Sequence, residues 1–154
     1  MKHHWAALGL VLALSAPMAS SADAQAGPPQ TSTGRRSGPL GQNYPNPFNP
    51  ETRIPFTVGL NDANPPVCTD PARAHRVSLR IYNLLSQVVA IPVLQGGGAS
   101  GGRPTENLQL QCGQYTAFWD GTERGTSRQV ASGIYYYRLE IDGRPYVNSM
   151  LVAK

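Results

Sequence analysis

The chain has 154 residues, and its 16 glycines and 14 prolines hold about a fifth of the positions, against about 12% in ordinary domains. Because both residues interrupt helices, long helices are not expected to dominate the fold. Only 14% of the residues are charged, the net charge is +4, and seven Tyr, three Phe and two Trp supply apolar bulk. These values exclude a highly charged disordered chain. The length fits one domain with tails rather than a two-domain enzyme.

The first 26 residues are predicted to be an export signal. Lys2 precedes an apolar run over residues 5–16, and residues 24–26 (AQA) form the small-x-small pattern that signal peptidase cleaves. The apolar run is too short to cross a bilayer, which takes about 20 residues. We therefore expect the general export machinery to carry the chain and signal peptidase to cut it between Ala26 and Gly27.

The two cysteines, Cys68 and Cys112, are predicted to form a disulfide. An even number of cysteines in an exported chain is most simply a bridge, and closing a loop of about 45 residues removes roughly 4 kcal/mol of unfolded-state entropy. Metal binding is the weaker interpretation, because structural zinc takes four ligands and the mature chain offers the two thiols only one histidine, His75.

Residues 27–42 lack hydrophobic periodicity and are predicted to be a flexible leader, so the folded domain is expected over residues 43–154. Within that domain apolar residues recur with a period of two, which is typical of half-buried strands. The dipeptide Asp142-Gly143 separates the last two strands and favours a tight hairpin turn. The predicted strands cover residues 53–60, 77–82, 88–94, 108–112, 115–119, 133–141 and 146–152.

Seven short strands without a convincing helix predict an all-β fold, an antiparallel Ig-like β-sandwich. Pro55 and Pro92 lack the N–H group that a sheet ladder needs, which favours edge positions for their strands. Phe48, in the proline-rich segment that opens the domain, is predicted to anchor that segment to the core. Trp119 is interpreted as a core residue rather than a platform for a ligand.

The residues that catalysis needs are not found in a suitable pattern. His75 is predicted to lie in an exposed loop just before a strand, and the chain has no G-x-S-x-G nucleophile motif. Residues 120–123 lack the spacing of a calcium loop, and the glycine-rich residues 96–102 are not followed by the Lys-Ser/Thr of a phosphate-binding loop. The basic residues are scattered. We therefore expect no enzyme activity, no cofactor or metal, and no nucleic-acid partner.

Five segments, in order, resemble the C-terminal sorting domains of the type IX secretion system of Bacteroidota-like bacteria. The WDG and VASGIYYYRLE segments also resemble the Ig-like domain of flagellar hook-capping proteins. Ser86 stands where the family usually has glycine. Together the segments span essentially the whole folded part. They are NYPNPFNPETRI (43–54), VSLRIYNLLSQVV (77–89), WDG (119–121), VASGIYYYRLE (130–140) and SMLVAK (149–154).

The resemblance implies a β-sandwich that an outer-membrane translocon recognises and that a cell-surface sortase cuts in the familiar cases. It implies a route through the periplasm to the cell surface or the medium. The alternative expectation is a structural or adhesive surface module that assembles by adding strands across exposed sheet edges. By resemblance, the recognised positions are Pro45, Asn46, Pro47, Phe48, Gly133, Tyr135, Met150, Leu151, Val152 and Lys154.

Overall fold

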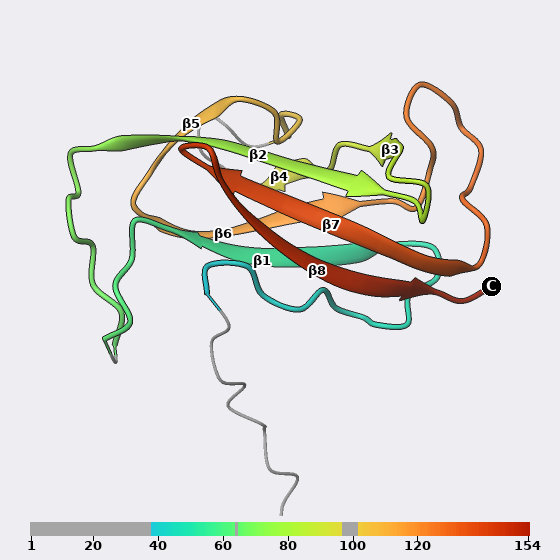
Figure 1. The fold of residues 1–154 in the computed structure, drawn as a ribbon, viewed down its shortest axis with the longest axis horizontal. Helices are drawn as coiled ribbons and strands as arrows, with labels where there is room; N and C mark the ends of the chain where they lie inside the picture. The colour runs from blue at the N-terminus through green and yellow to red at the C-terminus, as the bar shows by residue number, and fades with distance from the viewer. Residues whose placement is uncertain (1–37, 64, 97–101) are drawn as a thin grey trace, which may run out of the picture. The chain divides into compact units, whose positions relative to one another are not determined.

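A computed structural model describes residues 38–63, 65–96 and 102–154, so the predicted signal peptide, its Ala26–Gly27 cleavage site and residues 27–37 lie outside the described residues. The described chain forms eight strands (Figure 1). No helix long and apolar enough to cross a membrane occurs in the described part. The strands are β1 (Thr52–Val58), β2 (Ala74–Tyr82), β3 (Val88–Ala90), β4 (Val93–Gln95), β5 (Leu108–Gln111), β6 (Gly113–Trp119), β7 (Gly133–Ile141) and β8 (Arg144–Val152).

The strands make two antiparallel sheets in a sandwich-like arrangement, which confirms the all-β prediction. One sheet has the order β1-β6-β4, and the other has the order β3-β2-β7-β8, with β5 also paired to β2. In Figure 1 the β7–β8 hairpin lies over the layer that contains β1 and β6. Both β1 and β8 end their respective sheets.

Alternating side chains fill the space between the sheets. In β1, Ile54, Phe56 and Val58 are buried, whereas Arg53 and Pro55 are partly exposed on the outer face. The same alternation in the other strands follows from the pleat of a strand, which turns successive side chains to opposite faces. The other buried apolar residues are Leu40, Phe48, Val77, Leu79, Ile81, Ala90, Leu94, Leu108, Leu110, Ala117, Trp119, Val130, Tyr137, Leu139, Met150 and Val152.

The prediction of a single strand over residues 88–94 is wrong, because the structure has two strands there. β3 pairs with β2 and β4 pairs with β6, so the chain changes sheets between Ala90 and Val93. Pro92 lies between β3 and β4, outside both ladders. Its lack of an N–H group therefore costs no hydrogen bond between strands. The Pro92 carbonyl accepts hydrogen bonds from the Thr105 N–H at 2.8 Å and the Thr105 hydroxyl at 2.6 Å. The predicted edge placement is correct, since β3 and β4 each end a sheet.

The turn at Asp142-Gly143 and the turn at Ser86 use left-handed backbone conformations. The predicted Asp142-Gly143 turn is confirmed, with φ of 49° and 82° at its two residues. Ser86 also has a positive φ of 60°, in the turn between β2 and β3. Glycine adopts this region without steric cost, whereas a residue with a β-carbon does not. The backbone at Ser86 therefore gives a physical reason for the glycine that the resembled family carries there.

The predicted disulfide between Cys68 and Cys112 is confirmed, with Cα atoms 5.7 Å apart. Cys68 lies in the segment after β1, where its backbone forms an isolated antiparallel β-bridge with Leu60. Cys112 is the residue between β5 and β6. The disulfide thus ties this segment, which contains no named strand, to the sandwich.

Candidate functional site

The segment that enters the domain, residues 39–48, is named the entry segment here. It begins to pair at Pro39, ahead of the predicted domain start at Asn43. The Thr57 N–H donates to the Pro39 carbonyl at 2.7 Å, and the Gly41 N–H donates to the Pro55 carbonyl at 2.9 Å. Proline has no backbone N–H group, so on that edge of β1 Pro55 offers only its carbonyl oxygen, which accepts a hydrogen bond.

A buried polar network holds the middle of the entry segment. The Asn43 N–H donates to the Tyr137 hydroxyl at 3.0 Å, and that hydroxyl donates to the Gly41 carbonyl at 2.9 Å. The Asn43 side-chain amide donates to the Pro45 carbonyl and to the Thr52 hydroxyl, both at 3.0 Å. Burial raises the pKa of Tyr137 to about 12, and the hydrogen bond from Asn43 partly opposes this. Sequence reasoning missed this network, although a tyrosine on the inward face of a strand indicates a buried partner for its hydroxyl.

The end of the entry segment covers the C-terminal end of the free edge of β8. The Phe48 N–H donates to the Leu151 carbonyl at 3.0 Å, and the Ala153 N–H donates to the Phe48 carbonyl at 3.1 Å. The side-chain oxygen of Asn46 accepts the Leu151 N–H at 2.9 Å. An edge strand offers such groups to any chain that can pair with it. Here the same chain already occupies them.

An aromatic cluster fixes the entry segment to the core. The Phe48 ring is 1% exposed, and its centroid lies 5.3 Å from that of Trp119. The Trp119 ring lies 6.0 Å from Tyr135 of β7, and its indole N–H donates to the Thr122 carbonyl at 2.9 Å. The predictions that Phe48 anchors its segment and that Trp119 belongs to the core are therefore confirmed.

Four of the five segments that carry the family resemblance, all but residues 77–89, meet at one end of the sandwich, near the C-terminus (Figure 1). Gly133 pairs with Val152, and Tyr135 pairs with Met150, on the adjacent strands β7 and β8. A β-carbon at Gly121 of the WDG segment would collide with the carbonyl oxygen of Pro50. Residues more than 100 positions apart in the sequence thus form a single cluster.

The sequence-predicted recognition residues divide into three groups by exposure. The buried residues build the end of the domain, and a partner that binds the folded protein can touch only the others. Met150 and Val152 are 2% and 3% exposed. Phe48, Met150 and Val152 are buried, Gly133 and Tyr135 are partly exposed, and Pro45, Asn46, Pro47, Leu151 and Lys154 are exposed.

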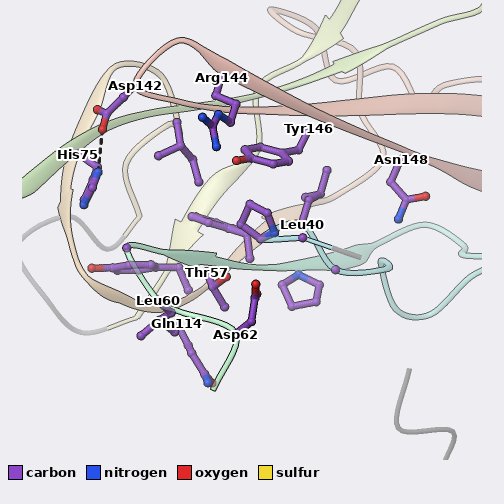
Figure 2. Close-up of a pocket in the computed structure, with 18 of the residues that line it drawn as sticks. Leu40, Thr57, Leu60, Asp62, His75, Gln114, Asp142, Arg144, Tyr146 and Asn148 are labelled. Atoms are coloured by element: carbon purple, nitrogen blue, oxygen red, sulfur yellow. Dashed lines mark hydrogen bonds and ion pairs between the residues drawn. The ribbon is translucent and has the colours of Figure 1, made fainter. Parts of the chain in front are cut away.

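A groove between β1 and the β7–β8 hairpin is a second candidate functional site (Figure 2). His75, predicted to lie in an exposed loop, lies instead in β2 with its side chain 13% exposed, because β2 begins three residues earlier than expected. Its Nδ1 lies 2.7 Å from Oδ2 of Asp142, whose Oδ1 accepts the Arg76 N–H at 2.9 Å. The hydrogen bond with His75 is the main cause that lowers the pKa of Asp142. This pair fastens the hairpin turn to β2.

No family model, curated protein or solved structure matches this chain. Its function must therefore be inferred from the residues that the fold brings together and from those that it leaves exposed. In the described ranges, no group of three or more His, Cys, Asp and Glu side chains is placed to hold a metal ion. The cluster at the C-terminal end is the stronger candidate site, because it unites most of the distinctive sequence segments.

Proposed function

We propose that this chain is an exported, non-catalytic Ig-like module that acts as a type IX C-terminal sorting domain. Its partners are then signal peptidase and the general export machinery, an outer-membrane translocon and the associated sortase. Its destination is the cell surface or the medium, reached through the periplasm. The observation that carries the proposal is that the entry segment, the WDG segment, the start of β7 and the end of β8 form one cluster.

The division between buried and exposed residues suits a signal that is recognised on a folded domain. Phe48 and Met150 are buried and fix the positions of their neighbours, whereas Asn46 and Leu151, which are hydrogen-bonded to each other, face solvent. A surface held in one conformation before binding loses less conformational entropy when a partner docks. We therefore expect the exposed residues to contact the translocon and the buried residues to hold that surface in one conformation.

The alternative function, assembly through exposed strand edges, has less support. The entry segment pairs with the free edge of β1 and with the end of β8. On the outer edge of β4, the Leu94 N–H donates to the Arg103 carbonyl at 2.9 Å, and the Gly102 N–H donates to the Leu94 carbonyl at 2.6 Å. A partner strand would first have to displace these segments, which costs the hydrogen bonds already made there.

An export assay tests the sorting function. A reporter domain is inserted between Ala26 and Gly27 of the full chain, and the fusion is expressed in a bacterium that has the type IX translocon. Deleting residues 150–154 would remove two buried side chains, so the test uses substitutions at exposed positions instead. Leu151→Ser and Lys154→Ser are combined, because both side chains face solvent at the end of β8.

We expect this double variant to keep the reporter in the periplasm, whereas the unaltered fusion delivers it to the surface or the medium. Val147→Ser is the matched control, because Val147 lies in the same strand and is 62% exposed. The control fusion is expected to be delivered like the unaltered fusion. Equal delivery of all three fusions, or equal delivery in a host that lacks the translocon, would contradict the sorting function.

A further inference from the structure

The Cys68–Cys112 disulfide lies beside the pair formed by His75 and Asp142. A β-carbon at Gly59 would stand 3.0 Å from Nε2 of His75 and 3.2 Å from the β-carbon of Cys112. Because glycine has no side chain, the imidazole and Cys112 face the same point with none between them. The backbone at Gly59 has a φ of 61°, which glycine adopts without steric cost. The fold thus brings a histidine next to one half of the disulfide.

Asp142 determines which nitrogen of the imidazole faces the disulfide. Nδ1 of His75 lies 2.7 Å from Oδ2 of Asp142, and this hydrogen bond is the main cause that lowers the pKa of Asp142. The same carboxylate oxygen accepts a hydrogen bond from Arg73 at 3.2 Å. An ionised carboxylate is an acceptor only, so Nδ1 keeps its hydrogen and Nε2 is the nitrogen that gains or loses a proton. The proton that changes the charge of His75 is therefore bound on the side of Gly59 and Cys112.

A positive charge on His75 favours the departure of the Cys112 sulfur. In thiol–disulfide exchange a thiolate attacks one sulfur of the bridge, and the other sulfur leaves as a thiolate. A cation within about 4–6 Å stabilises such an anion. The His75 side chain is only 13% exposed, so water screens its charge weakly. The Cys112 sulfur also lies 3.2 Å from the Gly59 carbonyl oxygen, which can accept a hydrogen bond from the thiol once the bridge is open. Both features favour the opening of the disulfide.

The disulfide is the covalent link between the sandwich and the segment that carries Cys68. The hydrogen bonds that the described residues 60–69 make join partners within residues 59–69. Cys112, in contrast, lies between the paired strands β5 and β6. Both cysteines are partly exposed, so a thiol from solution can reach the bridge. Opening the disulfide therefore releases this segment while both sheets keep their own hydrogen bonds.

We propose that the Cys68–Cys112 disulfide is a site of thiol–disulfide exchange with external thiols, that His75 assists the exchange, and that the exchange releases the segment after β1. The thiol first loses its proton to solvent, and its thiolate attacks Sγ of Cys68. A mixed disulfide forms at Cys68, the bond between the two cysteine sulfurs breaks, and Cys112 leaves as a thiolate that takes a proton from solvent.

A second external thiolate completes the reaction. It attacks the sulfur of the first thiol in the mixed disulfide, and Cys68 leaves as a thiolate that is protonated by solvent. The chain has then gained two electrons and two protons, and the two external thiols have been oxidised to one disulfide. The exchange is independent of the sorting function, because it involves neither the entry segment nor β8.

A change of pH from 6 to 8 isolates the contribution of His75. Carboxylates, guanidinium groups and phenols do not change charge over this range, whereas an imidazole does. The other two histidines of the chain, His3 and His4, precede the predicted cleavage site. The titratable and charged side chains that line the groove together with His75 are Asp62, Arg73, Tyr115, Asp142, Arg144 and Tyr146.

Reduction of the mature full chain by glutathione tests the proposal. N-ethylmaleimide labels the free thiols after short times, and mass spectrometry then gives the initial rate and the cysteine that carries glutathione. We expect His75→Gln to slow the reaction about three- to tenfold at pH 6, because glutamine can bond to Asp142 but carries no charge. The two rates should approach each other at pH 8. In the unaltered chain, glutathione should be found on Cys68 and the label on Cys112.

Arg144→Gln is the matched control, because it removes a positive charge from an exposed side chain of the same groove. This variant should be reduced as fast as the unaltered chain at both pH values. A substitution that merely loosened the fold would expose the disulfide and speed its reduction, which is the opposite of the expected effect. The proposal would be overturned if His75→Gln were reduced as fast as the unaltered chain at pH 6 or faster. It would also be overturned by an equal slowing at pH 8, or by glutathione found mainly on Cys112.

Discussion

Replacing Tyr137 with phenylalanine is expected to loosen the entry segment without disturbing the packing of the core. The ring is fully buried, and phenylalanine keeps its shape. The change removes one group that accepts the Asn43 N–H at 3.0 Å and donates to the Gly41 carbonyl at 2.9 Å. The affected interactions therefore join β7 to a segment that lies more than 90 positions earlier in the sequence.

The expected magnitude follows from these two hydrogen bonds. Each contributes about 1 kcal/mol net, and a buried N–H left without a partner, as at Asn43, costs about 1–3 kcal/mol. We therefore expect Tyr137→Phe to lower the free energy of unfolding by about 2–3 kcal/mol. Tyr136→Phe is the matched control, because the Tyr136 side chain is 41% exposed and its hydroxyl can bond to water. Its effect should stay within about 0.5 kcal/mol.

The raised pKa of Tyr137 predicts that the folded chain loses stability at alkaline pH. The pKa of Tyr137 is raised to about 12 in the folded chain, whereas an unfolded tyrosine titrates near its ordinary value of 10.0. The folded state therefore holds the phenolic proton more tightly, and this stabilisation is complete below pH 10. It is lost as the pH rises from about 10 to about 12, by a total of about 2–3 kcal/mol.

Urea unfolding of both variants, at pH 7 and at steps above pH 10, measures both effects. Tyr137→Phe should be less stable at neutral pH and should lose less stability than the unaltered chain as the pH rises. Hydrogen exchange at the Asn43 amide provides a local measurement, and the exchange should be faster in the variant. A variant that matches the unaltered chain at pH 7, or that keeps its full alkaline loss, would refute the role given to this network.

Three further predictions concern the turns and the disulfide. Ser86→Gly should raise the free energy of unfolding by about 1 kcal/mol in thermal melts, because φ is 60° there, and Ser86→Ala should give no such gain. Replacing Cys68 and Cys112 with serine should lower it by up to roughly 4 kcal/mol, and an unchanged urea midpoint would contradict this. The pKa of Asp142 is lowered in the folded chain, so the ionised side chain stabilises the fold above pH 3.8, its ordinary pKa. This stabilisation is lost as the pH falls below 3.8. Asp142→Asn should therefore flatten the acid limb of the stability profile by less than about 1 kcal/mol, because the side chain is exposed.

Most of the strands and the faces that they bury could be predicted from the local sequence. The alternation of apolar residues predicted β7 from Gly133 to Ile141, and the Asp142-Gly143 turn predicted its hairpin with β8. These features depend on neighbouring residues only, since the pleat has a period of two and the turn requires residues that tolerate positive φ. The disulfide was also predictable, because the chain offers only two cysteines.

Which distant segments meet could not be predicted from local sequence patterns. Local periodicity did not show that the chain changes sheets at Pro92, that His75 lies on β2 against Asp142, or that Asn46 covers the end of β8. It also did not separate the buried Met150 from the exposed Leu151 as possible contacts for a partner. These outcomes depend on pairing between residues far apart in the chain. Such pairing is selected by the packing of two whole sheets and by the need to satisfy the hydrogen bonds at their edges.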